Sequence, residues 1–215
     1  LYLGQYLGNK YIYSKFIAER IILEAIATRG LSAKIMRVGN LAARSTDGEF
    51  QVNFSTNSFM GRIKVFNMLG CCPHEMRDNP AEFSPINEVS HAIVLLSKTP
   101  SECCVFHPYN NHQVLFGDVL SELKYVGDGV EFVNGDEFAR RMELAKEDPD
   151  KARQLSSLLA YQDMAHGHKT ADVARQNNYT MQVLYRLGYQ WSHTTWDYID
   201  RFLKAIAGMG FFDNK

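Results

Sequence analysis

Residues 11–30 read YIYSKFIAERIILEAIATRG and hold the clearest helical pattern in the chain. Apolar side chains recur there at helical spacing, and Gly30 is placed to end the helix in a left-handed conformation. Residues 33–38 are partly apolar and lead into Gly39-Asn40, as a strand does where it opens into a loop. A helix, a turn and a strand make half of an α/β repeat. The pattern therefore predicts an α/β fold.

A second helix–strand unit follows later in the chain. Asn87 is expected to cap a helix that runs to about residue 96, and residues 103–107 are expected to form a strand. Residues 44–82 lack sustained periodicity, so we expect an irregular insertion there with one helix around residues 58–69. The second unit supports a continuing α/β sheet.

Beyond residue 110 the chain is predicted to be mainly helical, with one strand at residues 130–133. The expected helices span residues 115–123, 136–145, 151–165 and 181–187, and a last one is capped by Thr194 or Thr195 and stops at Gly208. We expect this region to pack as a lobe. Its expected core buries Trp196, Phe202 and Leu203 against Val183, Leu184 and Leu187.

Composition excludes several classes of protein. The formal net charge of the 215 residues is -1, so no excess of positive charge is available to attract nucleic acid. No apolar run approaches the roughly 20 residues that span a bilayer, so we expect no membrane partner and a cytoplasmic location. The first residue is Leu rather than Met, and a helix follows almost at once, which suggests a piece of a longer chain.

Cysteine and histidine do not predict a metal site. The cysteines form two adjacent pairs, Cys71-Cys72 and Cys103-Cys104, and one peptide bond cannot easily aim both thiolates of a pair at one metal. Buried reduced thiols are the expected state. His166 and His168 lie in a short loop with no third ligand nearby and are expected to be exposed.

Tyr11 and Lys15 are four residues apart on the first helix, so their side chains can meet one turn apart. A lysine ammonium at about 4 Å favours the phenolate by up to ~4 kcal/mol at an effective dielectric constant of about 20. Such a pair suits a tyrosine that acts as a general acid. Tyr13 has Ile17 four residues on and therefore lacks a lysine partner. An isolated pair of this kind is a weak signal, and its context gives it weight.

The motif resembles the extended short-chain dehydrogenase/reductases. The likeness is strongest to the terminal thioester reductase domains of nonribosomal peptide synthetases and related carboxylic acid reductases. It rests on Tyr11 to Glu19, on a strand ending in residues 37–40, and on residues 83–89 and 179–206. The resemblance implies a Rossmann-like fold with a mainly helical substrate lobe. Its expected divisions are a catalytic core (1–45), a substrate-lobe insertion (46–82), a core return (83–109) and a helical lobe (110–215).

The resemblance also implies roles for single residues. Tyr11 would donate a proton, and Lys15 would orient the nicotinamide ribose and favour the phenolate. Gly39, Asn40 and Leu41 would pass near the nicotinamide, although the family often has proline where this chain has Val38. Residues of the insertion that could bind substrate are Asn53, Asn57 and Arg62.

Two elements of the family are missing from this sequence. No glycine loop that could hold a cofactor pyrophosphate occurs, and the substrate-binding serine or threonine cannot be assigned. We therefore expect the carboxyl-terminal part of an NADPH-dependent reductase that releases a thioester from a phosphopantetheinyl carrier domain. Alone, it is expected to bind NADPH weakly, to be inactive and to self-associate.

Two alternatives stay open at this point. A free-standing sugar-nucleotide epimerase or dehydratase shares the tyrosine–lysine pair but acts on a soluble substrate. A non-catalytic module that docks a carrier domain would keep the pair as a relic. The sequence does not decide the acyl or peptidyl substrate, the extent of reduction or the choice between NADPH and NADH.

Overall fold

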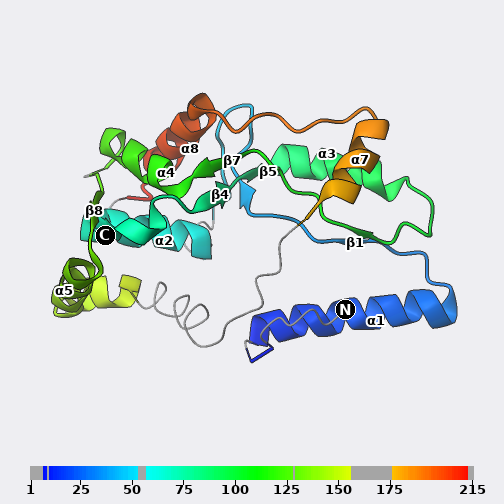
Figure 1. Cartoon of the computed structure of the whole chain (residues 1–215), viewed down its shortest axis with the longest axis horizontal. Helices are drawn as coiled ribbons and strands as arrows, with labels where there is room; N and C mark the ends of the chain where they lie inside the picture. Colours follow the sequence, from blue (N-terminus) through cyan, green and yellow to red (C-terminus); the bar gives the residue numbers. More distant parts are fainter. Residues whose placement is uncertain (1–6, 9, 53–56, 128, 156–175, 213–215) are drawn as a thin grey trace. The chain divides into compact units, whose positions relative to one another are not determined.

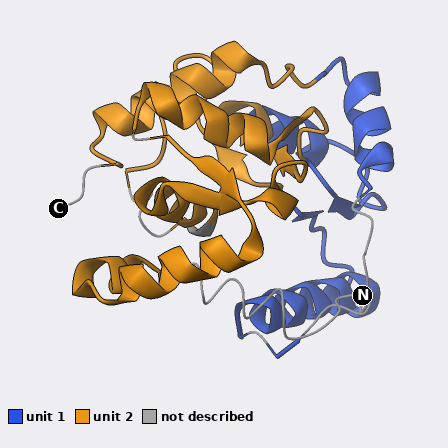
Figure 2. Cartoon of the chain, turned by 60° about the vertical axis from the view of Figure 1, so that its left-hand side comes forward, with its two compact units in different colours: residues 1–38, 90–108, 162–190 blue, residues 39–89, 109–161, 191–215 orange. Residues whose placement is uncertain are grey.

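The computed structural model describes residues 7–8, 10–52, 57–127, 129–155 and 176–212 (Figure 1). These residues form two compact units, each assembled from three stretches of chain (Figure 2). Unit 1 comprises residues 1–38, 90–108 and 162–190, and unit 2 comprises residues 39–89, 109–161 and 191–215. The boundary between the units at residues 89 and 90 falls inside one helix, α3, which spans Ile86–Ser97.

Among its described residues, unit 1 contains one parallel strand pair and, besides part of α3, two helices. Strand β1 (Ile35–Met36) pairs with β6 (Val105–Phe106), and the helices are α1 (Lys10–Arg29) and α7 (Asn178–Arg186). Helix α1 ends at Gly30, whose φ of 66° lies in the left-handed region that glycine adopts without strain. The predicted first helix is confirmed, and the parallel pair confirms the α/β class.

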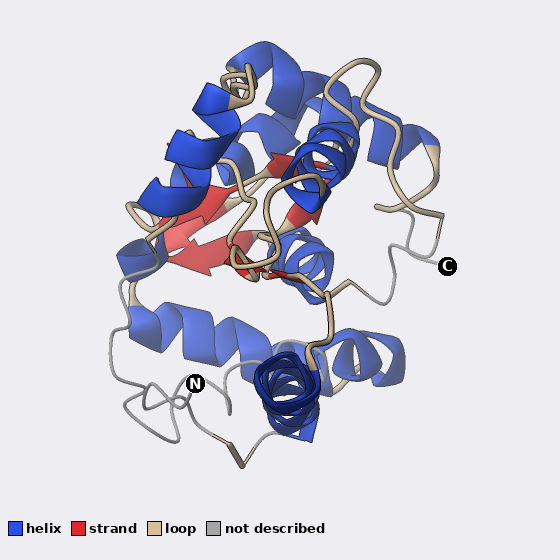
Figure 3. Ribbon diagram, turned by 90° about the vertical axis from the view of Figure 1, so that its right-hand side faces the viewer, coloured by secondary structure: helices blue, strands red, loops and turns tan. Residues whose placement is uncertain are grey.

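Unit 2 holds the other elements. Its strands are β2 (Leu41–Ala42), β3 (Cys71–Pro73), β4 (Pro80–Glu82), β5 (Ser84–Pro85), β7 (Gln113–Leu115) and β8 (Glu131–Val133). Its helices are α2 (Ser58–Leu69), α4 (Phe116–Glu122), α5 (Gly135–Lys146) and α8 (Trp196–Gly208), with 3-10 turns at His74–Met76 and Leu123–Tyr125. Residues 149–155 are also helical. The helices are much longer than the strands, as Figure 3 shows.

The strands of unit 2 form three pairs. Strands β2 and β5 are parallel, as are β3 and β8, whereas β4 and β7 are antiparallel with Pro80 opposite Leu115. A core of buried apolar side chains surrounds them, and Phe66, Phe83, Phe202 and Ile206 are among its members. Aromatic rings meet edge to face within it; for example, the Phe83 and Phe202 ring centroids lie 6.0 Å apart.

Two expectations from the sequence are wrong. Asn87 is not a helix cap, because α3 begins at Ile86 and the Asn87 side chain instead accepts a hydrogen bond from the Ser45 amide at 3.0 Å. Trp196 is 52% exposed and Leu187 is 41% exposed, so neither is part of the predicted buried cluster. Phe202 and Leu203 are buried as expected.

The predicted thiol state is confirmed in part. All four cysteines are free, but only Cys71 and Cys72 are buried, whereas Cys103 and Cys104 are half-buried. Burial, reinforced by neighbouring Cys71, raises the pKa of the Cys72 thiol to about 12, so this thiol stays protonated at neutral pH. No helix among the described residues has both the length and the apolar content needed to cross a bilayer.

Candidate active site

Helix α1 brings Tyr11 and Lys15 together. The Lys15 ammonium nitrogen lies over the Tyr11 ring, 5.3 Å from its centroid, as the i, i+4 spacing predicts. Tyr11 is 68% exposed, and its hydroxyl forms no hydrogen bond within the part of the chain that the structure describes. Both groups are therefore open to a ligand.

Helix α1 is tied to the end of β1 by an ion pair. The Arg37 guanidinium donates two hydrogen bonds to the Glu19 carboxylate, at 2.9 and 2.5 Å, and its third nitrogen lies 3.2 Å from His107 Nε2. The bidentate geometry fixes direction as well as distance. Hydrogen bonding to Glu19 raises the pKa of Arg37 above its ordinary value. Arg37 and Glu19 thus hold the tyrosine-bearing helix against the strand that precedes Gly39.

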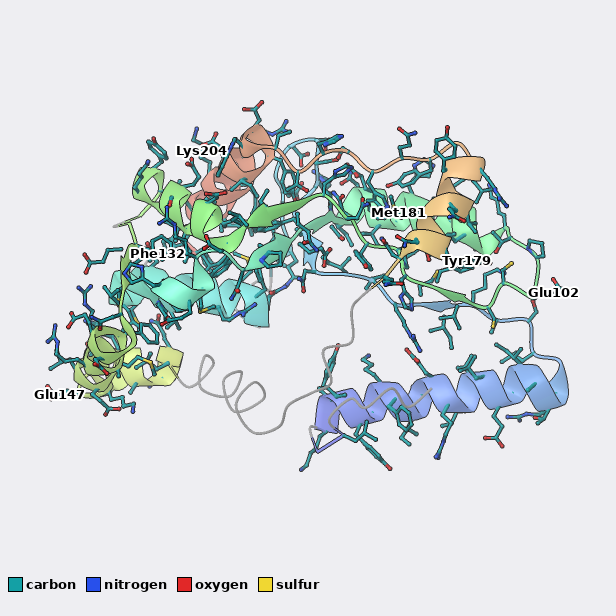
Figure 4. The ribbon with its side chains drawn as sticks, viewed as in Figure 1. Glu102, Phe132, Glu147, Tyr179, Met181 and Lys204 are labelled. Atoms are coloured by element: carbon teal, nitrogen blue, oxygen red, sulfur yellow. The ribbon has the colours of Figure 1, made fainter. Side chains whose placement is uncertain are left out.

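A second contact in unit 1 connects α7 to β6. Tyr179, on the first turn of α7 (Figure 4), stacks on Phe106 with 5.9 Å between ring centroids, and Thr180 accepts a hydrogen bond from the His107 amide at 2.8 Å. Tyr179 also has a raised pKa, chiefly because of a hydrogen bond with Cys103. Tyr179 and Thr180 therefore have a structural role, because they attach the start of α7 to β6.

Gly39, Asn40 and Leu41 lie in unit 2 and are held by the Glu82 carboxylate. Glu82 Oε2 accepts a hydrogen bond from the Asn40 amide at 2.8 Å, and Oε1 accepts one from the Ser84 hydroxyl. Ser84 donates its own amide to the Asn40 carbonyl at 3.0 Å. Hydrogen bonds from Glu82 and Ser84 thus hold the loop after β1, and we call this arrangement the clamp. The Asn40 backbone N–H already donates to Glu82, whereas Leu41 remains 38% exposed.

The clamp extends inward through buried groups. Ser84 is fully buried, and its hydroxyl accepts a hydrogen bond at 2.9 Å from the amide of Asn110, which is fully buried as well. A buried network of this kind rigidifies a site when each member has a partner. Glu82 and Ser84 were missed by the sequence reasoning. Glu82 ends β4 and Ser84 begins β5, so the period-two spacing of a single strand does not mark them, and the contact depends on how the strands are arranged.

The three expected substrate-binding residues have different outcomes. Asn57 caps α2, because its side-chain oxygen accepts hydrogen bonds from the amides of Phe59 and Met60 at 3.1 and 3.2 Å. The Arg62 guanidinium packs over the rings of Phe59 and Phe116, 5.7 and 5.9 Å from their centroids. Asn53 lies outside the described residues, as do His166 and His168.

No group of three histidine, cysteine or acidic side chains within the described residues is arranged to hold a metal ion. Unit 2 presents a glycine–asparagine loop that is held by hydrogen bonds. Unit 1 presents the exposed phenol of Tyr11 beside the ammonium of Lys15. A phenol and an ammonium placed in this way can donate a proton to an oxygen atom and stabilise the phenolate that remains.

Comparison with known proteins gives a consistent picture. Residues 2–93 match the NAD-binding family described as male sterility protein. The large subunit of L-2-aminoadipate reductase from Candida glabrata is 31% identical over 163 residues, which cover 73% of this chain and 11% of that protein. The chain therefore spans a small part of this curated relative.

Three solved structures share the fold. A thiolation-reductase di-domain from an archaeal non-ribosomal peptide synthetase is 34% identical, with a TM-score of 0.83 over 99% of this chain and 43% of that chain. The reductase domain of the Aureusimine biosynthetic cluster is 22% identical, with a TM-score of 0.78 over 97% of this chain and 53% of that one. The terminal R domain of the myxalamid PKS-NRPS pathway is also 22% identical, with a TM-score of 0.75 over 93% of this chain and 49% of that one.

Proposed function

Because the chain has the α/β fold of nonribosomal peptide synthetase reductase domains and matches the male sterility family over residues 2–93, we propose that it carries the catalytic tyrosine and lysine of an NADPH-dependent reductase. The reaction is release of a carrier-bound acyl or peptidyl thioester as an aldehyde or alcohol. The observation that carries the proposal is the exposed Tyr11 side chain with the Lys15 ammonium over its ring, on a helix inside the segment that matches the family.

Each unit, taken by itself, offers a group that could contact the nicotinamide half of a cofactor. Lys15 offers an exposed ammonium that can donate to ribose hydroxyls, and Leu41 offers an exposed apolar surface to a nicotinamide ring. A glycine loop for the pyrophosphate does not occur in the sequence. The cofactor, when bound, supplies the hydride. We expect the remaining contacts to come from polypeptide that is not part of this sequence, since the chain spans 43% of the archaeal di-domain.

The chain's own residues would handle the proton and the substrate oxygen. Tyr11 donates the proton of its hydroxyl to the thioester carbonyl oxygen as negative charge develops there. Lys15 stabilises the phenolate that this leaves, because an ammonium one helical turn away lowers the energy of the negative oxygen. Loss of the thiol from the resulting hemithioacetal would release an aldehyde, and a second reduction would give an alcohol.

The partner and the substrate belong to the same proposal. The archaeal relative is a thiolation-reductase di-domain, which supports a carrier domain as the partner that presents the thioester. A relative that joins a thiolation domain to its reductase favours a carrier-bound substrate over a soluble sugar nucleotide. If the chain only docked a carrier domain, Tyr11 would be dispensable. Replacing Tyr11 therefore distinguishes a catalytic role from a docking role.

The test replaces Tyr11 by phenylalanine in the complete natural protein that contains this chain. Loss of the proton donor should lower turnover by about 10²- to 10⁴-fold, the range typical of general acid catalysis. The same protein with Tyr13→Phe is the matched control, because Tyr13 lies on the same helix, is also exposed and lacks the lysine partner. Release of product by the Tyr11 variant at the control's rate would exclude Tyr11 from the mechanism.

A further inference from the structure

Unit 2 contains a hollow of about 480 Å³ that the reductase proposal does not use. Its walls come from the paired strands β4 and β7, from α4 and from the start of α8. The volume lies within the roughly 300–1,000 Å³ range of small-molecule sites. Trp196 and Leu115 line the hollow, and they are 52% and 43% exposed, so both offer apolar surface to a ligand.

Hydrogen bonds fix the walls in place without a ligand. Pro80 and Leu115 face each other across the antiparallel pair of β4 and β7. Thr194, two residues before the start of α8, donates its hydroxyl to the His112 carbonyl at 3.1 Å. The same hydroxyl accepts a hydrogen bond from the amide group of the buried Asn110 at 3.2 Å. The two loops that border the hollow are thus joined to each other, as in a pre-formed site.

The charge at the hollow is negative. Asp118 is the one charged side chain among the described residues that line it. Asp118 is half-buried and forms no ion pair or hydrogen bond within the described ranges, so its carboxylate is free to accept both from a ligand. Trp196 adds the electron-rich face of an indole ring, the aromatic surface that attracts cations most strongly. Both groups favour a cation over an anion.

We propose that this hollow binds a small organic ammonium ion. The ammonium group lies at the Asp118 carboxylate and against the face of Trp196, and the hydrocarbon part covers Pro80, Val114 and Leu115. An anionic ligand would meet the Asp118 carboxylate with the same charge. A neutral apolar ligand would strip water from that carboxylate without replacing its hydrogen bonds, which is unfavourable. The inference does not rest on the reductase role, because the two involve different residues.

A series of three matched ligands tests the charge preference in the unaltered chain. The probes are 2-phenylethylammonium, the neutral 2-phenylethanol and the anionic phenylacetate, each titrated while the indole N–H resonance of Trp196 is followed by NMR. Trp191, the other tryptophan, is 5% exposed and serves as an internal reference. We expect the ammonium to bind at least about tenfold more tightly than the alcohol, and phenylacetate to bind more weakly than both.

Two carboxylate variants then locate the effect. Asp118→Asn should reduce the affinity for the ammonium to that for the alcohol and leave the alcohol unchanged. Asp197→Asn is the control, because Asp197 is exposed and next to Trp196 in the sequence but does not line the hollow. Equal affinity for ammonium and alcohol in the unaltered chain would overturn the proposal, as would equal effects of the two variants. The ligand series decides the matter even if a variant does not fold.

Discussion

Gly39 lies so close to its neighbours that there is no room for a side chain. A Cβ atom at this position would stand 2.6 Å from Tyr109 Cβ and at least as close to the Glu82 carboxylate. The Tyr109 Cβ cannot move without its backbone, and Glu82 is held by the Asn40 amide and the Ser84 hydroxyl. The close approach thus explains glycine at this position through packing within the protein.

Replacing Gly39 by alanine should therefore lower the free energy of unfolding by roughly 1–3 kcal/mol, the usual range for overpacking. Urea unfolding of the variant measures the loss. Gly135→Ala is the matched control, because an added Cβ there meets nothing within 4 Å. The control should be neutral or slightly stabilising. If Gly39→Ala unfolded at the same urea concentration as the unaltered chain, the clamp around Asn40 would be looser than its hydrogen bonds indicate.

Elements were predictable where the evidence for them is local. Helix α8 spans Trp196–Gly208, as the sequence predicted, because its apolar spacing is a local signal. Thr195 precedes the helix but forms no side-chain capping hydrogen bond, and the left-handed glycine after the helix is Gly210, with a φ of 74°. The environment of Trp196 was not predictable. Helical side chains tilt toward the amino terminus, so a residue at the first position of α8 reaches past the packed part of the helix. Tyr198 is buried instead, and its hydroxyl donates to the Ala43 carbonyl at 2.9 Å.

In the candidate site, too, local contacts were predictable from the sequence and long-range contacts were not. The Tyr11–Lys15 pair followed from spacing on one helix. The Asn87–Ser45 and Glu82–Asn40 hydrogen bonds instead join residues 42 positions apart, and the Ser84–Asn110 hydrogen bond joins residues 26 positions apart. Such pairings depend on which strands become neighbours, and no local pattern contains that information. The sequence could therefore suggest the proton donor, but it could not show how the glycine–asparagine loop is held.

A pair of histidines joins two loops of unit 2 and predicts a pH dependence. The rings of His112 and His193 lie 3.8 Å apart. Burial and, after it, the charge of His193 lower the pKa of His112, while Glu88 opposes the shift. A histidine whose pKa is lower in the folded state takes up its proton in the unfolded state first. The pair should therefore cost stability as the pH falls through about 6.5 and below.

His193→Gln should reduce this loss of stability between pH 7 and pH 5.5, because it removes the charge that His112 meets. The free energy of unfolding measured in urea at each pH gives the comparison. His74→Gln is a suitable control, since His74 is exposed and stacks on Phe132 instead of on a titrating group. A pH dependence that is the same in both variants would remove the histidine pair as its cause.

At the scale of the whole molecule, open strand edges predict self-association. Each sheet that the described residues form has two strands of two or three residues, so each strand has one edge without a strand partner in that range. Open edges can pair with another copy of the chain. We expect the 24.5 kDa chain to form dimers or larger species as its concentration rises, as light scattering after size exclusion would show. A monomer at every concentration would contradict this.

Cofactor binding tests how much of a reductase this chain contains. Most of the affinity in dinucleotide-binding folds comes from a pyrophosphate seated on glycine-loop amides, and the sequence has no such loop. The groups that remain, Lys15 and the Gly39–Leu41 segment, would contact only the nicotinamide side. We therefore expect isothermal calorimetry of the isolated chain with NADPH to show binding weaker than micromolar, and the chain to reduce no thioester. The complete natural protein, titrated in parallel, provides the positive control.

Micromolar or tighter binding by the chain alone would mean that other residues of this sequence complete the cofactor pocket. The proposal that further polypeptide supplies the pyrophosphate site would then be wrong.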